Sequence, residues 1–471
     1  MLFPTPEYAL FFILAFAGAW LSARRLPLHK SFLLVASYAF YAYGDVRFVP
    51  VLLCVSVFST GIAAWVQRNA QHRYRKLALS FGVAGLLAIL VAFKFITFLT
   101  RLMLDGLQLL GVESDAHLPE VMLPIGISFF VFHGISLLVD AFRGHIATPI
   151  SWLDGLLYIA FFPQLVAGPI LRARNFLPQL VKGPSRDLDM SYALGLFMSG
   201  LVKKVLFANF LATQIVDPVY ADWDSASQSA AVLAFYGYAA QIFCDFSGYT
   251  DMAIASALLL GYSLPKNFDA PYLATDLRDF WRRWHISLSS WLRDYLYIPL
   301  GGSRHGSVRT SINLVVTMVL GGLWHGAAGT FVAWGAWHGV GLLVHRAWDQ
   351  SRFRPIVALR ATPIWRILAG VLTFHFVCIG WVMFRAPNLD ALRGVFRAMA
   401  EGTSGTFPIA AATIVLAGWG IQIWPKEWNP FIYFQRGRYA PLLQGALFAA
   451  GLWFISILAP SGVLPFIYFQ F

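Results

Sequence analysis

Long apolar runs follow one another along the whole chain, and they constrain its fold more than any other feature. A helix needs about 20 mostly apolar residues to cross the hydrocarbon core of a bilayer, and many runs in this chain of 471 residues approach that length. Only 12% of the residues are charged and 58% are hydrophobic, whereas soluble domains usually carry about a quarter charged residues. The sequence predicts an all-α polytopic membrane protein and excludes an ordinary globular enzyme.

The number of runs predicts about eleven transmembrane helices, with some shorter runs re-entrant or interfacial. The run from Tyr8 to Ala23 has no basic region before it and no cleavage site after it, so we interpret it as the first span, not as a signal peptide. With no long linker or low-complexity tract, we expect a single membrane-embedded domain over residues 1–471. The runs lie near 8–23, 31–43, 48–66, 77–100, 121–139, 152–168, 191–216, 229–261, 311–326, 328–345, 364–384, 408–424 and 441–459.

The net charge of +12 would suggest nucleic-acid binding in a soluble protein. Here the cations fall mainly in short loops between apolar runs, as in the basic stretch 67–76, while the loop 217–224 carries only acidic charges. Cytoplasmic loops of membrane proteins are enriched in Lys and Arg. We therefore expect the N-terminus outside, the basic loops in the cytoplasm, and membrane lipids, not nucleic acid, around the chain.

Residues 262–310 interrupt the apolar pattern without resembling a loop. Prolines, aromatic residues and paired charges alternate there with apolar residues, and Asp279 lies within helical reach of Arg283. This pattern is typical of amphipathic helices at the membrane interface. Irregular backbone at that depth is tolerated inside protein or beside a water-filled cavity, so we expect a cavity entered from the cytoplasmic side.

Two histidines stand out in this half of the chain, His285 within WHISLS and His325 within GGLWHG. An imidazole titrates near physiological pH and can take a proton from a hydroxyl, and ionisable residues inside membrane segments are functional candidates. A hydrogen-bonded core histidine is the competing interpretation. Among the other histidines, we expect solvated loop residues at His29, His72, His117 and His305, a helix cap at His345, and competitors in apolar runs at His133, His338 and His375.

Metal binding is not supported by the spacing of possible ligands. Neither His285 nor His325 has a histidine four residues on or a cysteine nearby, so a closed zinc site is not predicted. Three cysteines cannot all form disulfides, and each lies in an apolar stretch, so we expect them to be small buried residues. They are Cys54, Cys244 and Cys378.

Several long motifs carry a resemblance to a known family. They read WRRWHISLSSWLRDYLYIPLGGSR (281–304), TMVLGGLWHGAAGTFVAWGAWHG (317–339), LPIGISFFVFHGISLLVDAFRG (123–144), FFPQLVAGPILR (161–172), QIFCDFSGYTDMAIASALLLGY (241–262) and NFDAPYLATDLRDFW (267–281). On these motifs the chain resembles the membrane-bound O-acyltransferase family, in its alginate O-acetyltransferase branch. The resemblance implies helices around a central tunnel, with a catalytic core over approximately 121–345.

The resemblance also implies a site and a chemistry. The family's near-invariant histidine falls on His325, the expected general base, and its second position falls on His285, which would orient the acceptor or donate to the oxyanion. The donor is expected to be cytoplasmic acetyl-CoA, with no cofactor bound permanently. Trp284 and Trp324 are grouped with the donor-binding residues and are expected to pack the two imidazoles into place, unless they only fill the core. Coenzyme A phosphates are expected to meet Arg278, Arg282, Arg283 and Arg304, unless these cations only anchor the chain to the membrane and pair with acidic neighbours.

The expected setting is the bacterial inner membrane, where periplasmic acetyltransferases would pass the acetyl group to an exopolysaccharide such as alginate. Segments 101–120 and 385–407 are candidate docking surfaces on the outer face. Three alternatives stay open: D-alanyl or other acyl transfer from a carrier protein, acetylation of another polymer such as cellulose, and a transporter in which His325 relays protons. Asp245 and Asp251 are expected to pair with a buried cation, chosen among Lys203, Lys204 and Arg172.

Overall fold

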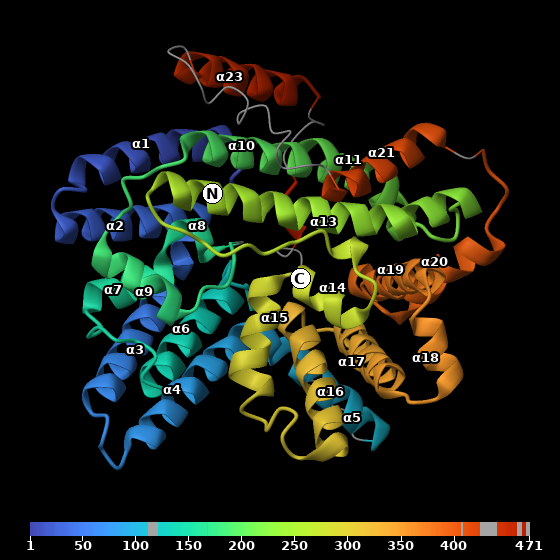
Figure 1. Ribbon diagram of the computed structural model, residues 1–471, viewed down its shortest axis with the longest axis horizontal. Coiled ribbons are helices and arrows are strands. Elements are labelled where there is room, and N and C mark those ends of the chain that lie inside the picture. The colour runs from blue at the N-terminus through green and yellow to red at the C-terminus, as the bar shows by residue number, and fades with distance from the viewer. Residues whose placement is uncertain (112–120, 167, 407, 424–439, 459–463, 468–471) are drawn as a thin grey trace. The chain divides into compact units, whose positions relative to one another are not determined.

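The computed structural model describes residues 1–111, 121–166, 168–406, 408–423, 440–458 and 464–467, and most of the residues in these ranges are helical (Figure 1). The described residues contain no β-strand, and Ser227 and Thr403 form an isolated β-bridge. This confirms the all-α class. The chain divides into two compact units, residues 1–188 with 256–264 and residues 189–255 with 265–471. A single domain over the whole chain stays a prediction.

Six helices or continuous helical runs in the described residues are long and apolar enough to cross a membrane. Four shorter apolar helices of 10–17 residues accompany them. Large apolar side chains point outward on these helices, for example Leu21 with 85% exposure and Val35 with 70%, as lipid-facing surfaces require. Cys54 on α3 is also exposed, so the expectation that all three cysteines are buried is wrong for this one.

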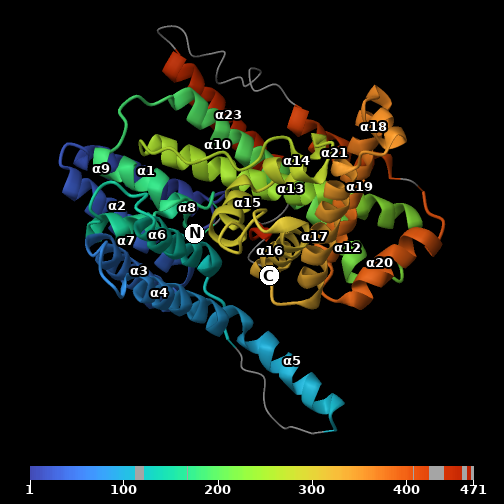
Figure 2. The same ribbon diagram turned by 60° about the horizontal axis from the view of Figure 1, so that its bottom comes forward.

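The first unit begins with a hairpin of α1 and α2 and continues with α3, α4 and α6, which pack on one another. Figure 2 shows α4 and α5 following one another in nearly one line, joined by the π-helical turn Val91–Phe95. The bounds of the helices are α1 Pro6–Ser22, α2 Leu26–Asp45, α3 Val49–Arg68, α4 Arg75–Leu90, α5 Ile96–Leu109, α6 Ile127–Phe142, α7 Trp152–Ala160, α8 Phe162–Leu165 and α9 Ala173–Lys182.

His29 corrects an expectation from the sequence. It lies in α2, not in a loop, and is 1% exposed. Its Nδ1 is 2.9 Å from the carbonyl oxygen of Ala19, and its Nε2 is 3.1 Å from the hydroxyl of Tyr262. His72 and His305 are exposed as expected, and His117 lies outside the described residues.

A buried ion pair joins α2 to α7 in the first unit. The Lys30 ammonium lies 2.5 Å from the Asp154 carboxylate, and both side chains are about nine-tenths buried.

Replacing Lys30 with methionine is expected to lower the free energy of unfolding by about 3–5 kcal/mol, because an uncompensated carboxylate stays buried. Denaturant titration of the purified protein measures the change. The double variant Lys30→Met/Asp154→Leu is expected to recover most of it, and a double variant as unstable as the single one would contradict this account.

The second unit is organised by α13, a helix of 32 residues, whose last turn belongs to the first unit. α16 and α17 form a second hairpin, and α19 packs on α17. The polar band becomes short helices, α14, α15 and the π-helical turn Arg293–Tyr297. The bounds are α10 Met190–Leu201, α11 Asn209–Leu211, α12 Asp217–Ala221, α13 Gln228–Leu259, α14 Leu277–Arg283, α15 Ile286–Leu292, α16 Gly306–His325, α17 Gly329–Gln350, α18 Arg354–Arg360, α19 Pro363–Arg385, α20 Leu389–Glu401, α21 Ile409–Gly420 and α23 Ala440–Leu458.

The acidic residues inside α13 pair with lysines, as the sequence predicted. Lys204 lies 2.5 Å from Asp245, and Lys203 forms an ion pair with Asp251. The four side chains are mostly buried. Such pairs let charges remain inside an apolar bundle, because each charge is compensated by its neighbour.

Candidate active site

His325 is the last residue of α16, at the corner where the chain turns into α17. The glycines before it permit this corner. A Cβ atom at Gly322 would lie 2.2 Å from the carbonyl oxygen of Phe331, and one at Gly335 would lie 2.5 Å from the carbonyl oxygen of Met318. The backbones of α16 and α17 therefore touch, and this contact holds His325 at a defined place.

Aromatic side chains surround the His325 imidazole, which is 4% exposed. Its ring centroid lies 4.9 Å from that of Trp324, 5.2 Å from that of Trp334 and 5.0 Å from that of Phe384, all in edge-on geometry. Rings packed in this way restrict rotation of the imidazole. Trp334 comes from α17 and Phe384 from α19, so three helices fix one side chain. The sequence motifs did not single out Trp334 or Phe384 for this role.

His285 lies in the two-residue joint between α14 and α15, completely buried. Its backbone is left-handed, with φ 42° and ψ 54°. A non-glycine residue in that conformation costs on the order of 1–3 kcal/mol and is found mainly where the surrounding structure enforces it, as at functional sites. The joint is thus a place where the fold, not local preference, sets the side-chain direction.

Asn267 holds this joint and determines the tautomer of His285. Its Oδ1 accepts a hydrogen bond from the backbone N–H of Ser287 at 3.0 Å and lies 3.2 Å from His285 Nδ1. A backbone N–H can only donate, so the Asn267 atom is the oxygen and His285 Nδ1 must carry the proton. The carbonyl oxygen of Asn267 also accepts from the Ile286 N–H at 2.9 Å.

This hydrogen bond leaves the other nitrogen of His285 available as an acceptor. Nε2 is buried and has no hydrogen-bond partner among the described residues. Burial lowers the pKa of the His285 imidazole, which lies between the candidate spans, so the ring is neutral. A neutral imidazole with a proton on Nδ1 presents a lone pair at Nε2. That lone pair can accept a hydrogen bond from a hydroxyl.

Trp324 connects the two histidines. Its ring centroid is 4.9 Å from that of His325 and 6.1 Å from that of His285. Phe246 of α13 closes the other side of His285, with ring centroids 4.5 Å apart. The structure thus brings the two histidines into one buried cluster around a shared indole, with no lipid-facing exposure of either ring.

The sequence predicted that Trp284 packs against a key histidine, but the structure places its ring among other aromatic side chains. Its ring packs on Trp381 at 4.7 Å, on Phe268 at 5.0 Å and on Phe280 at 5.8 Å between centroids. The left-handed joint follows directly after Trp284, and the His285 ring contacts Trp324 and Phe246 instead. Trp284 therefore fills the core behind the joint, and no ring contact between it and either key histidine occurs among the described residues.

The four arginines expected to meet the donor are largely engaged with protein groups. Arg283 pairs with Asp279 at 2.8 Å, and Arg278 lies 3.7 Å from Asp349. Arg304 donates to the carbonyl oxygen of Ile298 at 3.2 Å within its own loop. Arg282 is exposed and forms no ion pair with any residue that the structure describes. A guanidinium that is already paired with a carboxylate attracts a phosphate less strongly than an unpaired one does.

The three competing histidines differ in their surroundings. His133 Nε2 accepts from the Leu171 N–H at 3.3 Å, and His375 lies 2.9 Å from the Tyr236 hydroxyl, so both have structural partners. His338 is fully buried, and neither ring nitrogen has a partner among the described residues. Its centroid is 4.9 Å from that of Trp334, which also contacts His325. His338 therefore belongs to the same cluster, although its spacing alone did not distinguish it.

No group of three His, Cys, Asp or Glu side chains in the described part of the chain is arranged to hold a metal ion. The described cluster consists instead of imidazole and aromatic rings, with amide and hydroxyl neighbours. Imidazole rings can exchange protons and form hydrogen bonds, and such interactions are stronger in a buried interior than in bulk water.

Fold and site together define a helical membrane protein with two buried imidazoles at the joints of its helices. A family model for the membrane-bound O-acyltransferases matches residues 35–388. The chain belongs to this family and is a multi-pass membrane acyltransferase.

Curated relatives support the assignment. A probable alginate O-acetylase of Azotobacter vinelandii is 40% identical over 408 residues, which cover 85% of this chain and 78% of the relative. A peptidoglycan O-acetyltransferase of Helicobacter pylori is 34% identical, covering 85% and 80%. A teichoic acid D-alanyltransferase of Bacillus subtilis is 30% identical over 277 residues, covering 55% and 68%.

Proposed function

We propose that the chain transfers an acetyl group from a cytoplasmic thioester, acetyl-CoA, to a hydroxyl presented from the other side of the bacterial inner membrane. The end acceptor is an exopolysaccharide such as alginate, reached through periplasmic acetyltransferases. Five probable alginate O-acetylases at 37–40% identity support the choice of group and polymer. The observation that carries the proposal is the pair of buried imidazoles around Trp324.

In the proposed reaction His325 is the general base. It takes the proton from the acceptor hydroxyl as the oxygen attacks the thioester carbonyl, and a base of this kind contributes about 10²–10⁴-fold to the rate. The C–S bond then breaks, the new C–O ester bond remains, and the proton passes from His325 to the leaving thiolate. Positioning in the buried site supplies the rest of the acceleration.

His285 orients the acceptor in this scheme. Two roles were open for it, donation to the oxyanion and orientation of the hydroxyl. The proton on Nδ1 faces Asn267, and a neutral ring then has only its lone pair at Nε2 to offer. The hydrogen-bond pattern supports orientation of the hydroxyl by acceptance of its hydrogen bond.

The exposed Arg282 is the group we propose for the first contact with the phosphates of coenzyme A. Arg278 and Arg283 would exchange their acidic partners for phosphate only at the cost of those ion pairs, which at exposed sites are worth about 0–1 kcal/mol. That cost is small enough for a polyanionic donor to displace Asp349 or Asp279. Trp324, not Trp284, is the tryptophan we place beside the reacting groups.

A second candidate function is D-alanyl transfer from a carrier protein, favoured by the similarity to a teichoic acid D-alanyltransferase. The two candidate functions differ in the acyl donor. Acetyl-CoA needs a narrow pocket with cationic groups for its phosphates, whereas a carrier protein needs an exposed docking face. Acetylation of cellulose or another polymer would leave the donor and the histidines unchanged.

The purified protein in proteoliposomes separates these possibilities. Vesicles receive acetyl-CoA labelled in the acetyl group, or a D-alanyl carrier protein, and free thiol and labelled ester are both measured. We expect thiol release and ester formation only with acetyl-CoA, and no glycan movement. Reaction with the carrier protein alone would reassign the donor. Passage of glycan without thioester consumption would replace the enzyme proposal by transport.

A further inference from the structure

Three segments of the first unit meet at the turn between α1 and α2. A Cβ atom at Gly183, which directly follows α9, would lie 3.2 Å from Cδ1 of Leu26 at the start of α2. Two residues further on, the backbone N–H of Ser185 donates a hydrogen bond to the carbonyl oxygen of Gly261 at 2.9 Å. α9 accordingly lies beside the hairpin of α1 and α2 in Figure 1 and in Figure 2. The turn and the chain that follows α9 therefore form one continuous surface.

This surface has four exposed cations without a counter-ion in the described part of the chain. Arg24 and Arg25 lie in the turn after α1, Lys182 is the last residue of α9, and Arg186 lies in the loop that follows. None of the four side chains forms an ion pair or a hydrogen bond with a described residue. We call these four residues the turn patch.

The acidic groups nearby do not neutralise the turn patch. The loop between α9 and α10 carries two carboxylates, Asp187 and Asp189. Asp189 accepts a hydrogen bond from the backbone N–H of Tyr192 at 2.9 Å and so caps α10. Four cations against two carboxylates leave an excess of two positive charges. A local excess of this kind produces a positive potential that attracts anions.

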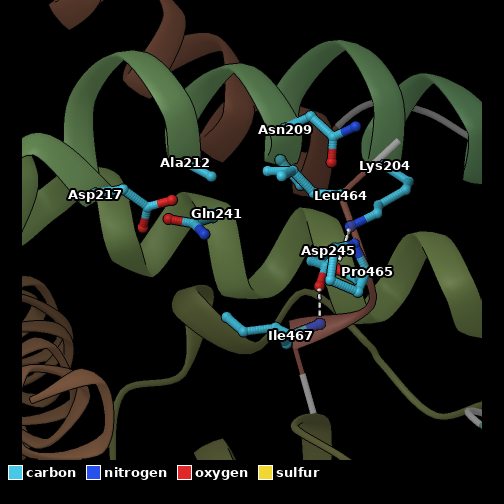
Figure 3. A pocket seen from close by; sticks show the side chains of 10 residues that line it. Lys204, Asn209, Ala212, Asp217, Gln241, Asp245, Leu464, Pro465 and Ile467 are labelled. Carbon is cyan, nitrogen blue, oxygen red and sulfur yellow. Dashed lines mark hydrogen bonds and ion pairs between the residues drawn. The ribbon is translucent and has the colours of Figure 1, made fainter. Parts of the chain in front are cut away.

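Several other cations of the protein differ from the turn patch because they have acidic partners. Lys204 lies 2.5 Å from Asp245 inside the second unit, as Figure 3 shows. Arg393 and Arg397 on α20 are as exposed as the patch residues, yet each forms an ion pair with an acidic neighbour. A paired cation attracts a further anion less strongly than an unpaired one. Exposure alone therefore does not make a binding site, and the missing counter-ions distinguish the turn patch.

Apolar side chains border the turn patch and indicate what kind of anion it meets. Leu21 is 85% exposed and Leu28 is 53% exposed, one on each side of the two arginines in the sequence. Val181, directly before Lys182, is also exposed. Cations that border a lipid-facing apolar surface lie at the level of the lipid head groups and attract anionic lipids. A free anion or an acidic soluble protein would leave these apolar side chains without an apolar partner.

We propose that the turn patch binds an anionic phospholipid through its phosphodiester group, with the acyl chains against Leu21 and Leu28. The two guanidiniums can each donate a pair of hydrogen bonds to phosphate oxygens, and Lys182 and Arg186 add charge from the second segment. A zwitterionic lipid has the same phosphate but also a cation of its own, which the excess positive charge repels. The site therefore selects anionic over zwitterionic lipid. The proposal does not depend on the acyl transfer proposed above.

Native mass spectrometry of the purified full chain tests this proposal. The protein in detergent micelles is titrated with phosphatidylglycerol or with phosphatidylcholine of the same acyl chains, and the apparent Kd for the first bound lipid is measured. Exposed substitutions of this kind leave the fold nearly unchanged. The two site variants are Arg24→Gln/Arg25→Gln and Lys182→Gln/Arg186→Gln. The matched control is Arg393→Gln/Arg397→Gln, which removes two exposed but paired cations.

We expect phosphatidylglycerol to bind at least about tenfold more tightly than phosphatidylcholine, and each site variant to lose about 10- to 30-fold in affinity for it, because each cation near the head groups contributes to the attraction. The control should stay within about twofold of the unmodified protein. Equal affinity for the two lipids, or a loss in the site variants no larger than in the control, would overturn the proposal. Displacement of the lipid by inorganic phosphate would overturn it as well, since the site would then take a free anion. No donor or acceptor is present, so a failure of acyl transfer has no bearing on this result.

Discussion

Replacing His325 with alanine is expected to lower the rate of acyl transfer by about 100- to 10,000-fold, the usual contribution of a general base. The aromatic cage of Trp324, Trp334 and Phe384 touches the imidazole on several sides, so no solvent base can easily take its place. The measurement is thioester consumption by the purified variant at saturating donor, together with the O-acetyl content of the exported polymer in cells.

The control for this variant is His305→Ala, which changes an exposed histidine of the same unit. It is expected to transfer acyl groups at the normal rate. Polymer export should continue in His325→Ala cells while acetylation is lost. Loss of export with normal acetylation would favour the transport hypothesis. An activity of His325→Ala within threefold of the unmodified protein would remove His325 from the mechanism.

Replacing Asn267 with leucine is expected to slow acyl transfer by about 5- to 150-fold, the equivalent of the roughly 1–3 kcal/mol that it costs to leave a buried hydrogen-bond donor without its acceptor. Asn267 acts through His285 and is therefore a positioning residue. Without its Oδ1, the His285 ring is free to exchange its proton between the two nitrogens. The loss should fall on kcat and on the KM for the acceptor, while the KM for the donor stays unchanged.

Rescue by a conservative change distinguishes positioning from folding. Asn267→Asp keeps an acceptor oxygen for Ser287 and His285 and should recover most of the rate. Asn175→Leu, at an exposed asparagine of α9, should have no effect. If Asn267→Leu is folded and raises only the donor KM, or if Asn267→Asp is no better than Asn267→Leu, the proposed tautomer lock is wrong.

Much of the architecture could be predicted because the bilayer imposes simple rules on composition. The shortage of charged residues and the recurring apolar runs indicate helices, since only helices and closed barrels satisfy their backbone groups in lipid. The partners of Asp245 and Asp251 were narrowed to a few cations by the same rule, and Lys204 and Lys203 are those partners. The identity of His325 came from motif resemblance, because spacing alone left other histidines as competitors.

Other expectations failed where local sequence carries little information. His29 follows a short basic stretch and seemed solvated, yet it lies in α2 and bonds to Tyr262, more than 200 residues away in the chain. The docking segments 101–120 and 385–407 lie partly outside the described residues and stay predictions. The number of about eleven transmembrane helices also stays a prediction. Length and apolar content show whether a helix can cross the membrane only for the longer helices.

The apolar runs, their charge pattern and the two histidine motifs were readable in the primary structure, since each depends on residue type and short-range spacing. The contacts that bring the two histidines together could not be predicted from the primary structure. Asn267 sits 18 residues before His285, Trp324 next to His325 contacts both rings, and Trp284 next to His285 contacts neither. A left-handed joint and a glycine-lined hairpin decide these directions, and both are enforced by packing between distant segments, not by the preference of any single residue.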